Sequence, residues 1–350
     1  MLRMTKTVIA NKLQGLCGNP YFSILYYQFL TEVYHRKGGF SMIIHNSFYF
    51  DSSDGITTVH AEEWLPEEKP KAVLQIAHGI AEYIHRYDAF ARFLAENGIA
   101  VVGEDHIGHG ESVMEGMPVV YFGKKNGWNN VVSDLHKIRT MYGEKYPDIP
   151  FFLMGHSMGS FLARTYLIKY PGDVDGTIIM GTGHQGSALV AGGKLIGHIV
   201  GRLNGFDKPH NLVTTLAFGS YNNGFENPRT EFDWLSVNEE NVDKYIADPF
   251  CGEPATVGIF LDMLGGIGFI RRQKNVNKMD AKKPVLFISG DKDPVGDNGK
   301  GVKAAHATFE KAGVKDLTLK LYPGLRHEIL NEDCRQEVFE YILDWIENRI

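Results

Sequence analysis

One segment, FFLMGHSMGSFLA at residues 151–163, constrains the fold of this chain more than any other. Its first four residues carry no polar side chain, which is typical of a strand that is buried on both faces of a sheet. From Phe161 onward, apolar residues recur at helical spacing. Ser157 lies between the two patterns and is flanked by Gly155 and Gly159. The segment therefore predicts a strand, a sharp turn at Ser157 and a helix.

The rest of the chain repeats this alternation of short apolar segments and helix-length segments. Turn residues 51–55 separate two alternating segments and predict an antiparallel hairpin. Further strands are predicted at residues 71–79, 99–106, 151–157, 175–183, 284–291 and 317–324, with helices at 87–97, 130–146, 158–170, 301–312 and 334–349. Strands that alternate with helices predict a mainly parallel sheet covered on both faces. In such sheets, ligands bind at the carboxyl ends of the strands.

One interval interrupts the alternation. About a hundred residues separate the strand that ends near Gly183 from the strand that begins at Pro284, which is too long for an ordinary loop. We therefore expect an inserted subdomain at residues 186–275, between core segments 46–185 and 276–350. Within it, residues 189–206 have the pattern of an amphipathic helix that contains several glycines.

The N-terminal segment 1–45 is interpreted as an extension, helical in structure, that precedes the core. Its first apolar run, at residues 8–10, is broken by Asn11 and Lys12, whereas a secretory signal needs about 7–15 apolar residues. The apolar stretch at residues 20–30 is shorter than the roughly 20 residues that span a bilayer. We expect it to pack on the domain or on another subunit, with contact to a membrane surface as the alternative.

Composition excludes several classes of protein. The 350 residues carry a formal net charge of −6, which argues against a nucleic-acid partner. The three cysteines, Cys17, Cys251 and Cys334, lie far apart, which favours a reducing compartment over a disulfide framework or a zinc ribbon. We therefore expect a cytoplasmic protein, with membrane association through the extension or the inserted segment as an option. The oligomeric state is left open.

The turn at Ser157 matches the G-x-S-x-G nucleophile elbow, in the strand–turn–helix setting that this motif requires. Ser157 is expected to adopt a strained, positive-φ conformation, in which residues two before and two after it nearly touch. Only glycine fits at such positions, which accounts for Gly155 and Gly159. The following helix N-terminus would direct the N–H of Met158 toward an oxyanion formed on the substrate.

A serine hydroxyl needs a base within hydrogen-bond reach. In this topology the base follows the last strand, where the loop after residues 317–324 contains His327. An orienting carboxylate is expected after the preceding strand, and the segment FISGDKDPV offers Asp291 and Asp293 there. We favour Asp293, with Asp291 as the alternative. The chain order Ser157, Asp293, His327 differs from those of the chymotrypsin and subtilisin arrangements.

A second oxyanion donor is expected after the first central strand, where the sequence reads HGIAE at residues 78–82. Gly79 permits close approach of the backbone, and the N–H of Ile80 is the candidate donor. His78 is interpreted as a structural hydrogen-bonding residue.

Other constellations do not fit cofactor chemistry. The DHIGH segment at residues 105–109 offers no third metal ligand in sequence, and its glycine fits a turn. The segment that begins at Asp291 has Val295 and Val302 where a calcium-binding loop needs oxygen ligands. Gly299 and Lys300 lack the remaining residues of a phosphate-binding loop. We predict no metal site and no cofactor.

Taken together, the motifs HGIAEYIHRY, DHIGHGES, FFLMGHSMGS, SGDKDPVG and YPGLRHEIL resemble the α/β-hydrolase superfamily. They are most similar to the monoacylglycerol lipase and lysophospholipase-like group of serine aminopeptidase-type hydrolases. The resemblance implies an α/β-hydrolase fold, with a mostly parallel eight-stranded sheet, helices on both faces and an inserted lid over an acyl-chain pocket. It also implies a catalytic triad of Ser157, Asp293 and His327, with Ile80 and Met158 as amide donors.

These features predict a serine hydrolase that cleaves carboxylic esters through an acyl-enzyme. The expected substrate is a small-molecule ester or lipid, such as a monoacylglycerol or a lysophospholipid. A short-chain esterase, thioesterase, amidase, peptidase or perhydrolase of the same fold remains an alternative. A non-catalytic binding protein of this fold would be expected to lack a triad member, whereas this chain has all three.

Overall fold

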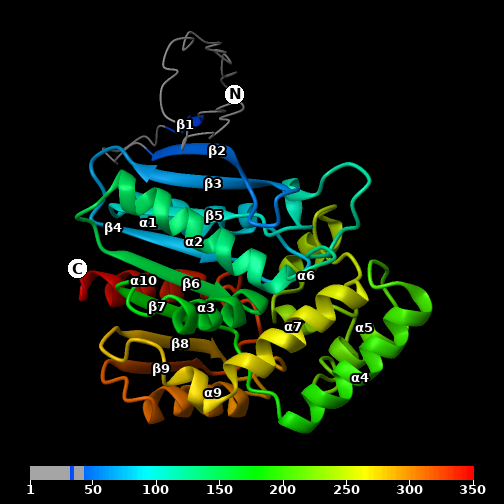
Figure 1. Ribbon diagram of the computed structural model, residues 1–350. Coiled ribbons are helices and arrows are strands. Elements are labelled where there is room, and N and C mark those ends of the chain that lie inside the picture. The colour runs from blue at the N-terminus through cyan, green and yellow to red at the C-terminus, as the bar shows by residue number, and fades with distance from the viewer. Residues whose placement is uncertain (1–31, 35–42) are drawn as a thin grey trace.

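The computed structural model describes residues 32–34 and 43–350, and within them it forms one twisted sheet covered by helices (Figure 1). The strand order is β1-β2-β3-β5-β4-β6-β7-β8-β9. Pairings are antiparallel from β1 to β5 and parallel from β5 through β9. The strands are β1 (Glu32–Tyr34), β2 (Ile43–Asp51), β3 (Thr58–Pro66), β4 (Ala72–Ala77), β5 (Ile99–Glu104), β6 (Phe151–His156), β7 (Gly176–Met180), β8 (Val285–Gly290) and β9 (Leu317–Tyr322).

The sheet confirms the predicted mostly parallel α/β-hydrolase architecture. Strands β2 to β9 are the eight expected strands, and the three-residue β1 adds a ninth at the edge of the described sheet. Every residue of β4, β5, β6, β7 and β8 is buried, as expected for strands covered on both faces. Strand β2 instead alternates buried and half-buried residues, because it lies near the antiparallel edge.

Most of the predicted N-terminal extension, residues 1–31 and 35–42, lies outside the described residues, and so does its expected helix. The described part of segment 1–45 is extended. Glu32–Tyr34 pairs with β2, and β2 itself begins at Ile43, before the expected start of the core at residue 46. Asn46, Phe48 and Phe50 alternate along β2 and are buried on one face, so pairing with β3 favours a strand here.

Two apolar layers hold the helices on the sheet. The first layer joins one face to α2 (Gly127–Lys145), α3 (Met158–Lys169) and α9 (Lys300–Lys311). The second joins the opposite face to α1 (Asp88–Glu96) and α10 (Arg335–Glu347). Successive residues of one strand, such as Phe151 and Phe152 on β6, belong to different layers, as the twofold period of a strand requires.

A helical segment is inserted between β7 and β8, which are neighbouring parallel strands in the sheet. It contains α4 (Ser187–Asn204), α5 (Asn211–Phe218), α6 (Glu239–Ala247), α7 (Val257–Ile270) and α8 (Gln273–Val276). Helix α4 covers most of the amphipathic segment predicted at residues 189–206. Helix α7 packs against α3 and α4, and Figure 1 shows α4, α5 and α7 gathered beyond one end of the sheet.

Candidate active site

Ser157 occupies a strained turn between β6 and α3. Its φ of 54° and ψ of −120° lie outside the regions that L-residues ordinarily adopt. A Cβ on Gly155 would lie 2.2 Å from the Gly159 carbonyl oxygen, and a Cβ on Gly159 would lie 1.9 Å from the Ala77 carbonyl oxygen. Both contacts are far below van der Waals distance, so the backbone can close this turn only around glycine.

His327 and Asp293 form a buried hydrogen-bonded pair. His327 follows β9 and Asp293 follows β8, and the imidazole Nδ1 lies 2.9 Å from Asp293 Oδ2. Asp293 is fully buried, and it also accepts hydrogen bonds from Ser289 Oγ at 3.1 Å and from the Val295 N–H at 2.9 Å. The alternative carboxylate, Asp291, accepts a hydrogen bond from the Gly324 N–H at an exposed position instead.

Two backbone amides are placed near Ser157. The loop after β4 runs close beside the serine, since a Cβ on Gly79 would lie 3.1 Å from Ser157 Cβ. Met158 is the first residue of α3, so its N–H has no acceptor within the helix. Among the described residues, neither the Ile80 N–H nor the Met158 N–H donates a hydrogen bond, whereas the Ser157 N–H donates to the Met180 carbonyl.

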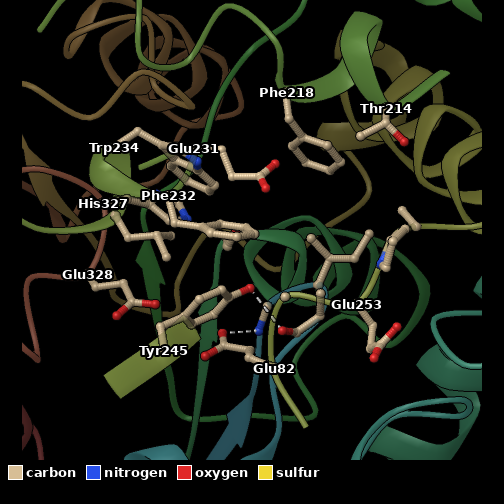
Figure 2. A pocket seen from close by; sticks show the side chains of 18 of the residues that line it. Glu82, Thr214, Phe218, Glu231, Phe232, Trp234, Tyr245, Glu253, His327 and Glu328 are labelled. Carbon is tan, nitrogen blue, oxygen red and sulfur yellow. Dashed lines mark hydrogen bonds between the residues drawn. The ribbon is translucent and has the colours of Figure 1, made fainter. Parts of the chain in front are cut away.

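A cavity of about 380 Å³ brings these groups together. The wall on the sheet side includes Ser157, His327, Gly79 and Ile80. Asp293 does not line the cavity, because it lies behind His327. The inserted segment supplies the opposite wall, which is largely aromatic and apolar (Figure 2). The Trp234 ring lies 5.1 Å from the His327 ring, measured between centroids. No sequence motif indicated this contact between the inserted segment and His327.

A buried ionic cluster supports the loops around the cavity. Arg86 donates to Glu82 Oε2 at 2.7 Å and binds both oxygens of Glu328 at 2.7 and 2.8 Å. Glu82 Oε1 also accepts the Gly79 N–H at 2.6 Å, so the cluster holds the loop that carries Ile80. Burial alone would raise the pKa of both carboxyls, but Arg86, together with His156 at Glu82, lowers the pKa of each below its ordinary value.

His156 links the cluster to the catalytic candidates. Its Nδ1 faces Glu82 Oε1 at 3.1 Å and the Tyr87 hydroxyl at 2.9 Å, and its Nε2 lies 3.3 Å from the His327 carbonyl oxygen. Burial would lower the pKa of His156, yet the hydrogen bond and the charge of Glu82 outweigh it, and the pKa is raised. Both ring nitrogens therefore face acceptors, as suits a protonated imidazole.

The sequence contained one signal for this cluster. Glu82, Arg86 and Tyr87 belong to the HGIAEYIHRY motif, but the motif by itself assigned them no role. Nothing in the sequence indicated that Glu328 would be the partner of Arg86, 242 positions away.

His78 and the DHIGH segment have structural partners. His78 Nε2 accepts the His106 N–H at 2.9 Å, and burial, together with nearby His106, lowers the pKa of His78 to about 3. Asp105 accepts the backbone N–H groups of Ile84 and Glu111, each within 2.9 Å.

A separate group, His45, His85 and Asp88, has ligand atoms within 4.8 Å of one another. Its members are already engaged: both imidazoles bond Glu62 Oε2, and Asp88 accepts both Trp64 Nε1–H and Arg92. These contacts account for the three side chains without an ion.

The chain is similar to several known proteins. Residues 68–334 match the family described as serine aminopeptidase, S33. A monoacylglycerol lipase of Mycolicibacterium smegmatis is 27% identical over 305 residues, which are 85% of this chain and 95% of that protein. The human monoglyceride lipase is 29% identical over 82% of this chain and 86% of its own length. A carboxyl esterase of Bacillus coagulans, solved with glycerol, has a TM-score of 0.82 at 29% identity and covers 87% of this chain and 98% of its own.

Proposed function

The chain belongs to the serine aminopeptidase S33 family, and we propose that it is a serine ester hydrolase of the monoacylglycerol lipase type. The observation that carries the proposal is the buried His327–Asp293 pair, at a cavity that His327 and the strained Ser157 line together. The constellation follows the chain order of α/β-hydrolase enzymes. The relatives of known activity point to esters rather than peptides as substrates.

We assign Ser157 as the nucleophile and His327 as the general base. His327 Nε2 takes the hydroxyl proton as Ser157 Oγ attacks the ester carbonyl carbon. Asp293 accepts the Nδ1 proton in a hydrogen bond, which holds the ring in the tautomer that leaves Nε2 free. His327 then protonates the departing alcohol, and the acyl group stays on Ser157. A water activated by His327 releases the acid and regenerates the serine.

The Ile80 and Met158 amides are the proposed oxyanion donors. Among the described residues, neither amide has a hydrogen-bond acceptor. Met158 directly follows Ser157, and Ile80 follows Gly79, where an added Cβ would lie 3.1 Å from Ser157 Cβ. Each donor would contribute roughly 2.7–4 kcal/mol to stabilising the tetrahedral intermediate. Because Glu82 binds the Gly79 N–H, the ionic cluster fixes the backbone one residue before Ile80.

The inserted segment is proposed to act as a lid over the acyl chain. Its side chains supply much of the apolar wall of the cavity, and the volume is in the range of small-molecule sites. This lining suits the acyl chain of a monoacylglycerol or of a lysophospholipid better than a peptide.

Contact with a lipid surface is proposed for the outer face of α4. Its leucine side chains are largely exposed, with Leu195 at 64% and Leu203 at 79% of full exposure. In the described part of the chain, no helix is long and apolar enough to cross a membrane. A cytoplasmic location remains a prediction, and the alternative contact through the N-terminal extension lies outside the described residues.

The experiment that tests the function combines active-site labelling with substrate rates. A fluorophosphonate probe should label the wild-type protein and should not label Ser157→Ala. Rates on 4-nitrophenyl esters of increasing chain length, followed by 1-monoacylglycerols, should favour medium or long acyl chains. Labelling of Ser157→Ala at the wild-type rate would refute the nucleophile assignment. A strong preference for acetate would refute the lipid substrate and leave the mechanism standing.

A further inference from the structure

The cavity beside Ser157 has an unbalanced charge. Four carboxylates line it, from Glu82, Glu231, Glu253 and Glu328, whereas no lysine or arginine of the described chain does. A cleft lined by one sign of charge attracts or repels charged ligands strongly when its walls are apolar. The four carboxylates differ in whether a basic side chain neutralises them.

The two inner carboxylates are neutralised. Arg86, behind the cavity wall, binds Glu82 and Glu328 together, and His156 provides a second positive partner for Glu82. With His156 protonated, this group of four side chains has no net charge. The inner carboxylates therefore leave little unscreened field in the cavity.

The two outer carboxylates have no such partner. Glu231 lies just before the aromatic pair Phe232–Trp234, and Glu253 lies between α6 and α7. Both are exposed, and neither forms an ion pair with a basic residue of the described chain. In Figure 2 the Glu231 carboxylate lies between Trp234 and Phe218, and the Glu253 carboxylate lies apart from it, at the lower right of the view.

Aromatic side chains share the cavity with these charges. Trp234, Phe218 and Phe232 also line it, and their rings supply no counter-charge. Because both carboxylates are exposed, salt screens their effect on an anion, and the effect is greatest at low ionic strength. Among the described residues that line the cavity, no lysine or arginine offsets these two carboxylates for an entering anion.

We propose that Glu231 and Glu253 make this cavity selective against anions. Esters with an uncharged head group, such as monoacylglycerols, are taken up, whereas esters that carry a phosphate are disfavoured. The same charges act on the product, because hydrolysis of a neutral ester with water yields a neutral alcohol, a carboxylate and a proton. The carboxylate is repelled and leaves. The proposal rests on the ester hydrolase function and specifies its substrate class.

The first test compares 1-octanoylglycerol with 1-octanoylglycerol 3-phosphate, which has the same acyl chain and an added anionic phosphate. The readout is the ratio of kcat/KM for the phosphate over the neutral ester at low ionic strength. Glu231→Gln with Glu253→Gln should raise this ratio roughly three- to tenfold. Adding 0.5 M NaCl should raise the wild-type ratio and have less effect on the double variant. The matched control is Glu310→Gln, on α9, which removes one exposed charge outside the cavity.

The second test measures octanoate binding by calorimetry, so it does not depend on turnover. The double variant should bind octanoate several-fold more tightly than the wild type does, and Glu310→Gln should not. Ratios and affinities that stay within twofold of the wild type would overturn the proposal. Failure of the ester hydrolase function would appear differently, as absent hydrolysis of both substrates, and the octanoate comparison would still decide the effect of the two carboxylates.

Discussion

Replacing Asp293 by asparagine tests the proposed triad most directly, because the structure determines how the new amide would orient. Asp293 Oδ1 accepts the Val295 N–H, and Oδ2 faces His327 Nδ1. An amide in this buried position would place its oxygen toward the Val295 N–H. Its NH₂ group would then face His327, whose Nδ1 would have to accept a hydrogen bond. The imidazole proton would move to Nε2, which could no longer take the proton of Ser157.

The opposite amide orientation is unfavourable. It would place the NH₂ group against the Val295 N–H, leaving two buried donors unpaired at about 1–3 kcal/mol each. We therefore expect the wrong tautomer to dominate and kcat to fall by up to about 10⁴-fold, equivalent to about 5.5 kcal/mol of activation free energy. The assay is the steady-state hydrolysis of a 4-nitrophenyl ester, with circular dichroism to check that the variant is folded.

Asp291→Asn provides the matched control two residues away. Asp291 accepts the Gly324 N–H at 2.8 Å in an exposed setting and has no hydrogen bond with His327. Its kcat should stay within a few-fold of the wild type. Two results would refute the reasoning: a loss of less than tenfold in folded Asp293→Asn, or a larger loss in Asp291→Asn than in Asp293→Asn.

Three further predictions concern stability and surface contacts. Gly155→Ala should lower the free energy of unfolding by about 3 kcal/mol or more, because the added Cβ would lie 2.2 Å from the Gly159 carbonyl oxygen. A urea titration that shows a loss below about 1 kcal/mol would contradict this prediction. Burial would raise the pKa of Glu62, but hydrogen bonds from His45 and His85 lower it from 4.5 to about 2. Because the folded pKa is the lower one, the stabilisation, about 3 kcal/mol, is complete above pH 4.5 and is lost as the pH falls toward 2. The unfolding free energies of the wild type and Glu62→Gln should therefore converge over that window, and a constant difference refutes the linkage. Leu195→Glu with Leu203→Glu should weaken binding to phosphatidylcholine vesicles at least fivefold, whereas Ile56→Glu, at the exposed β2–β3 turn, should not; equal effects exclude α4 as the contact.

Local patterns predicted much of the fold and the composition of the candidate site. The apolar runs identified strands β4 to β8, because parallel strands that are buried on both faces are predominantly apolar. The G-x-S-x-G motif identified the turn at Ser157, because close contacts between residues near in sequence leave no room for a Cβ at Gly155. The helical segment predicted at residues 189–206 was found as α4 for the same reason, since an amphipathic period is local.

Local patterns in the N-terminal segment did not indicate its strands. The helix expected in segment 1–45 remains a prediction, because most of that segment lies outside the described residues, whereas Glu32–Tyr34 and Ile43 onward are strands. Short edge strands depend on the partner that they pair with, and the pairing of β2 with β3 is a contact over many residues. The choice between Asp293 and Asp291 also depended on contacts between distant residues. Both follow β8, and only the folded loop places Asp293 beside His327.

The sequence alone determined the alternation of strands and helices, the strained turn at Ser157 and the candidates for the base and the carboxylate, because each is encoded in neighbouring residues. Only the tertiary structure decided which carboxylate faces His327, that Arg86 joins Glu82 to Glu328, and that Glu231 and Glu253 share a cavity with Ser157. These relations join residues from distant parts of the chain. They arise when the sheet brings the carboxyl ends of its strands together and the inserted segment folds over them.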